Sequence, residues 1–470
     1  MQMKQPSDKH RGNLVTRTSK VSSDHIRARF SAAMSAMYRE EVPAYGALMA
    51  LVAQVNAEVL ERDPQLAADL AETDQLGRIS EERHGAIRVG TAQELATIRR
   101  LFAVMGMFPV GYYDLSEAGV PVHSTAFRPV GEAALRANPF RVFTSLLRLD
   151  LIADADLRAE AEQILSRREI FTPACLGLIA KAEAEGGLDE NDADRFVAEA
   201  LETFRWHSDA LVSADLYKRL HDAHRLIADV VSFRGPHINH LTPRTLDIDA
   251  VQDRMPAHGI TPKAVIEGPP PRRCPILLRQ TSFKALQESV TFPGKTAVAG
   301  SHTARFGEIE ARGIALTPKG RALYDRLLAE VRTRIVPAAD GSNAGEYMRV
   351  LAEVFAAFPD DWTEIRRQGL GYFEWAPTGR GEVAGDDPEA LLAAGVLRCD
   401  PIVYEDFLPV SAAGIFQSNL GDAAVQAFRA SPNQRKFEAD LGAPVLDEFA
   451  HYAAIQQASL DACLKARRAA

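Results

Sequence analysis

Three short segments carry the residue types that could bind a redox metal: HGAIR at 84–88, HINH at 237–240 and FGEIE at 306–310. Two imidazoles and one carboxylate on one face of an iron(II) ion leave three positions open. Those positions can take a bidentate 2-oxo acid together with dioxygen, which is the chemistry of non-haem oxygenases. Zinc could use the same ligands but could not activate dioxygen by redox chemistry. The long sequence separations make this combined site a hypothesis.

The sequence leaves the choice of ligands within these segments open. HINH offers both His237 and His240, and a polar loop end would explain either. In an extended strand Glu308 and Glu310 would point to the same side, so periodicity does not choose between them. The two histidines of HDAHRL at 221–226 are a rival pair, because a spacing of three places both rings on one helix face. A solvated helix face is the more common reading of that pattern.

Arg88 follows His84 by four residues. If this segment is helical, both side chains project the same way. A guanidinium beside a metal ligand suits a dicarboxylate: the metal takes the 2-oxo acid end, and the arginine pairs with the far carboxylate. An ordinary surface salt bridge is the alternative interpretation.

The elements that must position these residues are of mixed type. Short segments rich in Ile, Leu, Val, Thr and Phe between prolines and glycines predict a β-rich core at about 237–313, with further strand-like residues at 107–130. Helix formers predict a helical insertion at about 133–231. Apolar residues at three- and four-residue spacing predict the other helices, at about 24–61 with a break at Pro43, 92–107, 318–336 and 441–469. The fold class expected is therefore α+β.

Composition limits the kinds of partner. The chain has 470 residues, a net charge of -9 and a pI of about 5.8, so nucleic acid is a poor candidate partner. No apolar run approaches the ~20 residues that cross a bilayer. The four cysteines form no CxxC pair, which favours reduced thiols in a cytoplasmic protein. Residues 1–20 have no apolar signal region and are expected to form a polar leader before one catalytic domain at 21–465.

Four separated motifs resemble those of the 2-oxoadipate dioxygenase/decarboxylase family. They are ERHGAIRVGT, RGPHINHLTPRTLDID, SHTARFGEIEARG and YEDFLPVSAAGIFQSNL, and they occur in the family's order. The resemblance extends from about Arg27 to Gln457. It implies an iron(II) enzyme with a core similar to the vicinal oxygen chelate fold. Such an enzyme converts 2-oxoadipate and dioxygen to (R)-2-hydroxyglutarate and carbon dioxide, a step of lysine breakdown.

The resemblance also implies roles for individual residues. The metal ligands carried over by motif are His84, His240 and Glu308, and both histidines would also lie against the substrate. Arg88 would hold the distal carboxylate of the substrate and so act in catalysis. The backbone at Val410 and Ser411 would close the pocket. The motif match, and not physical reasoning, favours His240 over His237 and Glu308 over Glu310.

Two other functions fit the same residues. The triad could hold zinc or manganese in a hydrolase or isomerase, because one fold hosts many reactions. The chain could also be a non-catalytic protein that binds a dicarboxylate. Oxygen consumption by iron-loaded protein would separate the first alternative from an oxygenase, and carbon dioxide release under air would separate the second. The sequence leaves the oligomeric state open.

Overall fold

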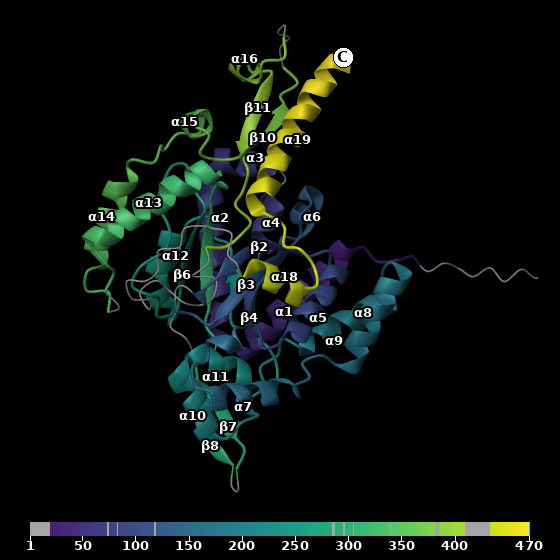
Figure 1. Cartoon of the computed structure of the whole chain (residues 1–470). Coiled ribbons are helices and arrows are strands. Elements are labelled where there is room, and N and C mark those ends of the chain that lie inside the picture. The colour runs from purple at the N-terminus through teal and green to yellow at the C-terminus, as the bar shows by residue number, and fades with distance from the viewer. Residues whose placement is uncertain are drawn as a thin grey trace, which may run out of the picture.

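Figure 1 shows the computed structural model of the chain, in which helices surround a central sheet. The structure describes residues 19–72, 75–81, 83–116, 119–283, 287–294, 297–303, 305–338, 340–380, 385–408 and 433–469. The leader expected at 1–20 falls almost wholly outside these ranges, and so do Val410 and Ser411. None of the described helices combines the length and hydrophobicity that crossing a membrane requires.

The central sheet has the strand order β2-β3-β4-β1-β5 within the described ranges. Strand β1 runs parallel to β4 and antiparallel to β5, and the other neighbours are antiparallel. Every residue of β3 and β4 is buried, as expected for strands covered on both faces. The bounds are β1 Arg83–Val89, β2 Phe108–Asp114, β3 Val122–Arg128, β4 Arg141–Leu147 and β5 Leu241–Pro243.

Strand β4 corrects the prediction that residues 133–231 are helical throughout. Its sequence, RVFTSLL, is rich in β-branched and aromatic residues and pairs with both β3 and β1. The strongly helical sequence that follows it obscured this short strand. The predicted helices do follow β4: α7 Ala155–Leu165, α8 Pro173–Glu185, α9 Glu190–Glu202, α10 Ala214–Ala223 and α11 Arg225–Ser232.

The β-rich character predicted for 237–313 is confirmed. Besides β5, this part of the chain contains the antiparallel pair β6 and β9 and the hairpin β7–β8. Beyond the end of β5, Arg244 forms an isolated parallel bridge with Glu310, which places β9 beside the edge of the central sheet. The bounds are β6 Leu278–Ser282, β7 Glu288–Phe292, β8 Val298–His302 and β9 Glu308–Arg312, and the separate pair is β10 Phe373–Pro377 and β11 Leu397–Pro401.

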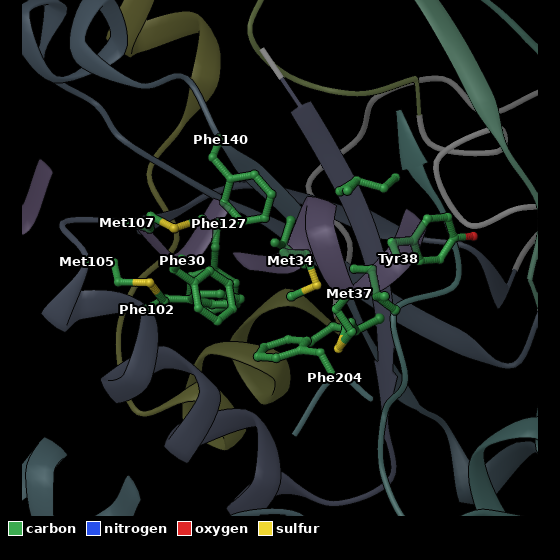
Figure 2. Packing of buried hydrophobic residues seen from close by; sticks show 14 of the residues in the cluster. Phe30, Met34, Met37, Tyr38, Phe102, Met105, Met107, Phe127, Phe140 and Phe204 are labelled. Carbon is green, nitrogen blue, oxygen red and sulfur yellow. The ribbon is translucent and has the colours of Figure 1, made fainter. Parts of the chain in front are cut away.

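Helix α1, Ser23–Glu41, connects the core to the segments that carry the predicted site. Phe30 packs edge-on against Phe140 and Phe204, at centroid distances of 5.9 and 5.4 Å (Figure 2). Two turns further along, the hydroxyl of Tyr38 donates to the carbonyl oxygens of Phe306, at 2.6 Å, and Asn239, at 3.1 Å. The buried face of α1 therefore contacts the backbone within both HINH and FGEIE.

Among the remaining helices, α1, α2, α5 and α13 begin and end close to the predicted positions, whereas α19 begins at Glu448, later than the predicted 441. Helix α12 lies in the segment predicted to be β-rich, and the helices α3, α4, α14, α15, α16 and α18 were not predicted from the sequence. Pro43 stands at the first position of α2, where a missing N–H costs least. Their bounds are α1 Ser23–Glu41, α2 Pro43–Arg62, α3 Pro64–Glu72, α4 Leu76–Glu81, α5 Ala92–Val104, α6 Glu132–Ala137, α12 Ile248–Arg254, α13 Pro318–Arg334, α14 Ala344–Phe355, α15 Trp362–Arg367, α16 Pro388–Ala393, α18 Gln434–Leu441 and α19 Glu448–Ala469, with 3-10 turns η2 Leu149–Leu151 and η3 Met255–His258.

Candidate metal centre

His84, His240 and Glu308 meet in the interior at the junction of β1, β5 and β9. All three are fully buried, and each offers a ligand atom within 4.8 Å of the other two. Glu308 Oε2 lies 3.4 Å from Nε2 of His84 and 3.4 Å from Nε2 of His240. Within the described part of the chain, this is the group of three such side chains that could hold a metal ion.

The unused polar atoms of this group fit a metal ion. Among the described residues, His84 Nε2, both ring nitrogens of His240 and Glu308 Oε1 have no hydrogen-bond partner. A buried polar atom without a partner costs free energy, and a coordinated cation removes that cost. Burial lowers the pKa of His240 to about 4, so its imidazole is neutral and keeps the lone pair that a ligand needs. Two imidazoles and a carboxylate suit iron(II) or zinc.

Glu310 shares the side of Glu308 but contacts the opposite nitrogen of His84. Its Oε2 lies 3.1 Å from His84 Nδ1, within hydrogen-bonding distance though not well aligned. Both of its oxygens accept from Arg312 at 2.8 Å. Burial alone would raise the pKa of Glu310, but Arg312, His84 and Arg141 lower it to about 2. Glu310 therefore contacts Nδ1 of His84, where it can orient the ring, while Glu308 faces Nε2 of His84 on the metal side.

The alternative histidines lie elsewhere. His237 points to a different polar cluster, with Nε2 3.4 Å from Asp229 Oδ1 and its ring edge-on to Trp206 at 4.7 Å. The rival pair in HDAHRL does not share a helix face, because α10 ends between its members. His224 Nδ1 instead accepts from Leu226 N and caps α11. The geometry therefore groups His240, and none of these three alternatives, with His84.

Arg88 lies on the same side of β1 as His84. The segment is a strand and not a helix, but residues four apart in a strand also share a face. Arg88 Nη1 donates to Asp229 Oδ2 at 2.7 Å and to Asn239 Oδ1 at 2.9 Å. Burial would raise the pKa of Asp229, but His237 and Arg88 hold it well below its usual value. Asp229 is therefore a carboxylate that holds one nitrogen of Arg88.

Sequence reasoning missed several residues around this centre. Asp229 sits in the apolar helix sequence LIADVVS, where an isolated acid was the available signal. His302 Nε2 lies 2.9 Å from the other oxygen of Asp229. Phe407, from the YEDF sequence before the predicted residues 410 and 411, packs edge-on against the His84 ring at 4.9 Å. The described part of that motif therefore reaches the first histidine.

A buried ionic chain extends from the centre to the YEDF segment. Arg141 places Nη1 3.5 Å from Glu310 and donates through Nη2 to Glu405 at 2.7 Å. Glu405 also accepts from Arg78 at 2.9 and 3.0 Å. Breaking such a chain leaves a buried charge unpaired, so the chain fixes where the YEDF segment lies relative to β9.

A mixed α/β fold with two histidines and a carboxylate converging between its strands defines a candidate mononuclear metalloenzyme. The sequence pattern of the 2-oxoadipate dioxygenase/decarboxylase family matches residues 30–419. The chain belongs to that family and is an enzyme of that type.

Relatives of the same description support this membership over most of the chain. The protein of Pseudomonas putida is 60% identical over 452 residues, which is 95% of this chain and 97% of the relative. The protein of Escherichia coli is 57% identical over 449 residues, which is 94% of this chain and 98% of the relative. The solved hydroxyglutarate synthase of Pseudomonas putida, in complex with 2-oxoadipate, superposes with a TM-score of 0.88 at 60% identity, covering 95% of this chain and 99% of the other.

Proposed function

We propose that this enzyme converts 2-oxoadipate and dioxygen to (R)-2-hydroxyglutarate and carbon dioxide, with iron(II) held by His84, His240 and Glu308. The observation that carries the proposal is the convergence of three buried side chains in which Nε2 of His84, Nε2 of His240 and Oε1 of Glu308 have no hydrogen-bond partner among the described residues. The solved hydroxyglutarate synthase of Pseudomonas putida, which is 60% identical to this chain, is in complex with 2-oxoadipate, and this supports 2-oxoadipate as the substrate. One carboxyl carbon leaves as carbon dioxide, and the product keeps both atoms of dioxygen.

The side chains of the site would divide the work between binding the metal and binding the substrate. Iron(II), when bound, would supply the redox chemistry that activates dioxygen, with open positions for a chelating 2-oxo acid. Arg88 would pair with the far carboxylate, and Asp229 and Asn239 hold Nη1 of that arginine in place. The backbone at Val410 and Ser411 would close the pocket, in a segment outside the described residues.

Aromatic rings would keep water away from the reacting carbon. Phe407 lies 4.9 Å from the His84 ring, and Phe306 lies 4.9 Å from the His240 ring. Apolar walls lower the local dielectric, which strengthens the pairing of Arg88 with a carboxylate. Positioning the 2-oxo acid and excluding water are thus the contributions of the protein itself.

Three broader assignments belong to the same proposal. The core would be related to the vicinal oxygen chelate fold, since its ligands come from strands or strand ends at the junction of β1, β5 and β9. The reaction would serve lysine breakdown, as the family resemblance implies. The enzyme would work in the cytoplasm, which agrees with four cysteines that form no disulfide.

The decisive experiment is an oxygen pulse on anaerobically iron-loaded protein with 2-oxoadipate, followed by mass spectrometry of the product. With isotopically labelled dioxygen, we expect 2-hydroxyglutarate that carries both labelled atoms, together with one equivalent of carbon dioxide. Zinc-loaded protein is the control and should consume no oxygen. Tight binding of 2-oxoadipate by iron-loaded protein without carbon dioxide release would instead indicate a binding protein.

A further inference from the structure

A cavity of about 480 Å³ opens between helices α10 and α11 and the β7–β8 hairpin. These elements lie together at the lower end of the molecule in Figure 1. Of the described residues that line the cavity, none is acidic, and four are or can become cationic: Lys218, His221, Arg225 and His302. On a chain with a net charge of -9, such a lining is a local exception.

One wall of the cavity lies a single side chain away from Arg88. His302 lines the cavity and is buried, with Nδ1 2.7 Å from the hydroxyl of Tyr217. Its Nε2 lies 2.9 Å from Asp229 Oδ1, and Asp229 Oδ2 accepts from Arg88 at 2.7 Å. His302 in the cavity wall is therefore separated by the Asp229 side chain alone from the arginine to which we assign the far carboxylate of the substrate.

Arg225 is the cation of this lining that is left for a ligand. It is exposed at the first position of α11, and no described residue forms an ion pair or hydrogen bond with its guanidinium. Lys218, by contrast, donates to Asp222 at 2.6 Å.

Arg225 also feels the charges of the interior. Partial desolvation lowers the pKa of Arg225, and the positive charge of Arg88 lowers it further, while Asp229 raises it. Burial, with a contribution from Arg225, lowers the pKa of Lys263 to about 8. Arg225 therefore lies within electrostatic range of two other cations, Arg88 and Lys263, which come from separate segments. A bound anion would reduce the repulsion between these positive charges.

We propose that this cavity is the port through which the 2-oxo dicarboxylate reaches Arg88, and that Arg225 draws the dianion in. The inference rests on the proposed function, because it takes the substrate to be a dicarboxylate. A dianion that approaches an acidic protein is repelled over most of the surface, and a cleft lined with positive charge raises its local concentration and its association rate. Arg225 would therefore act on substrate capture and not on the chemical step.

The test compares Arg225→Glu with Arg219→Glu in iron-loaded enzyme. Arg219 lies on α10 close by, pairs with Glu160 at 2.9 Å and does not line the cavity, yet its substitution changes the net charge equally. For Arg225→Glu we expect kcat/KM for 2-oxoadipate to fall about 10-fold at low ionic strength, with kcat within about twofold of the unsubstituted enzyme. The loss should shrink to about twofold or less near 0.5 M salt, because salt screens exposed charges. Arg219→Glu should change kcat/KM by less than about twofold.

Three results would overturn the port. They are an unchanged kcat/KM in Arg225→Glu, an equal loss in Arg219→Glu, and a loss confined to kcat. If the glutamate variant does not fold, Arg225→Gln is the test, because it only removes the positive charge. We expect kcat/KM for 2-oxoadipate to fall about threefold to fivefold in that variant. If the unsubstituted enzyme does not turn over 2-oxoadipate, the proposed function fails. If it does and the Arg225 variants match it, only the port fails.

Discussion

Replacing Glu310 by glutamine tests whether this residue orients His84 or binds the metal itself. Glutamine keeps an oxygen 3.1 Å from His84 Nδ1 but removes the negative charge that the imidazole faces. Changing a carboxylate behind a metal-bound histidine weakens metal binding by about 10- to 100-fold. Because an acceptor remains, we expect about 10-fold for Glu310→Gln, or ~1.4 kcal/mol, and nearer 100-fold for Glu310→Ala.

Glu405→Gln is the matched control for this substitution. Glu405 is also a buried carboxylate paired with Arg141, at 2.7 Å, but no described contact joins it to His84. Both variants leave Arg141 short of a partner, so both should lower the melting temperature. Only Glu310→Gln should weaken iron binding.

The assay is an anaerobic competition titration of iron(II) against a fluorescent chelator, with kcat measured at saturating iron. Unchanged iron affinity in Glu310→Gln, or an equal loss in Glu405→Gln, would refute the assignment of Glu310. Glu308→Gln belongs in the same series and should lose iron altogether. Full iron binding by that variant, with none by Glu310→Gln, would make Glu310 the ligand.

Three further predictions concern substrate binding, the pH dependence of stability and the support of the site backbone. Arg88→Lys keeps a cation beside Asp229 but loses the planar guanidinium that binds a carboxylate through two hydrogen bonds. We therefore expect kcat/KM for 2-oxoadipate to fall about 100-fold with iron content unchanged. Loss of iron would contradict the role of Arg88. Burial, aided by Asp406, raises the pKa of Glu448 from 4.5 to about 8, so the folded protein holds a proton that the unfolded chain has released. The contribution of Glu448 to the free energy of unfolding therefore falls as pH rises from about 4.5 through about 8. Glu448→Gln should raise the melting temperature near pH 9 but hardly near pH 4. Equal shifts of the melting temperature at both pH values would refute this prediction. Tyr38→Phe removes the hydroxyl shared by two buried carbonyl oxygens and should cost about 1–2 kcal/mol in urea unfolding, whereas a neutral effect would mean that those carbonyls do not depend on it.

The sequence was a good guide to helices α1, α2, α5 and α13 and to the strands within 107–130 and 237–313, because their patterns are local. It failed at β4, where seven residues that form a buried strand stand between helical sequences, and only pairing with β3 and β1 reveals them. The sequence also did not distinguish Glu308 from Glu310, because the difference lies in the contacts that each makes with His84 and Arg312 in the folded chain. In hindsight Arg312 offered a signal, because on a strand it lies on the same face as both glutamates and directly beside Glu310. For Asp229 the isolated acid in an apolar helix was the available signal, and it did not identify the partners, which come from β1 and β8.

The balance of charge at the site explains why a further cation is needed. Glu310 is offset by Arg312, and the pair Arg88–Asp229 is close to neutral before any substrate binds. Lys263 feels Glu267 most strongly among its charged neighbours, so these two also offset each other. If iron(II) binds beside Glu308, the site carries about one positive charge, which the chelating carboxylate of a 2-oxo diacid would cancel. The second carboxylate of that diacid then faces an arginine already paired with an aspartate, and among the described cations of the cavity and the site, Arg225 is the one that brings positive charge without a carboxylate partner. A 2-oxo monoacid lacks that second carboxylate, so the cost of Arg225→Glu should be much smaller for 2-oxohexanoate than for 2-oxoadipate. Equal losses for the two substrates would mean that Arg225 does not act through the far carboxylate.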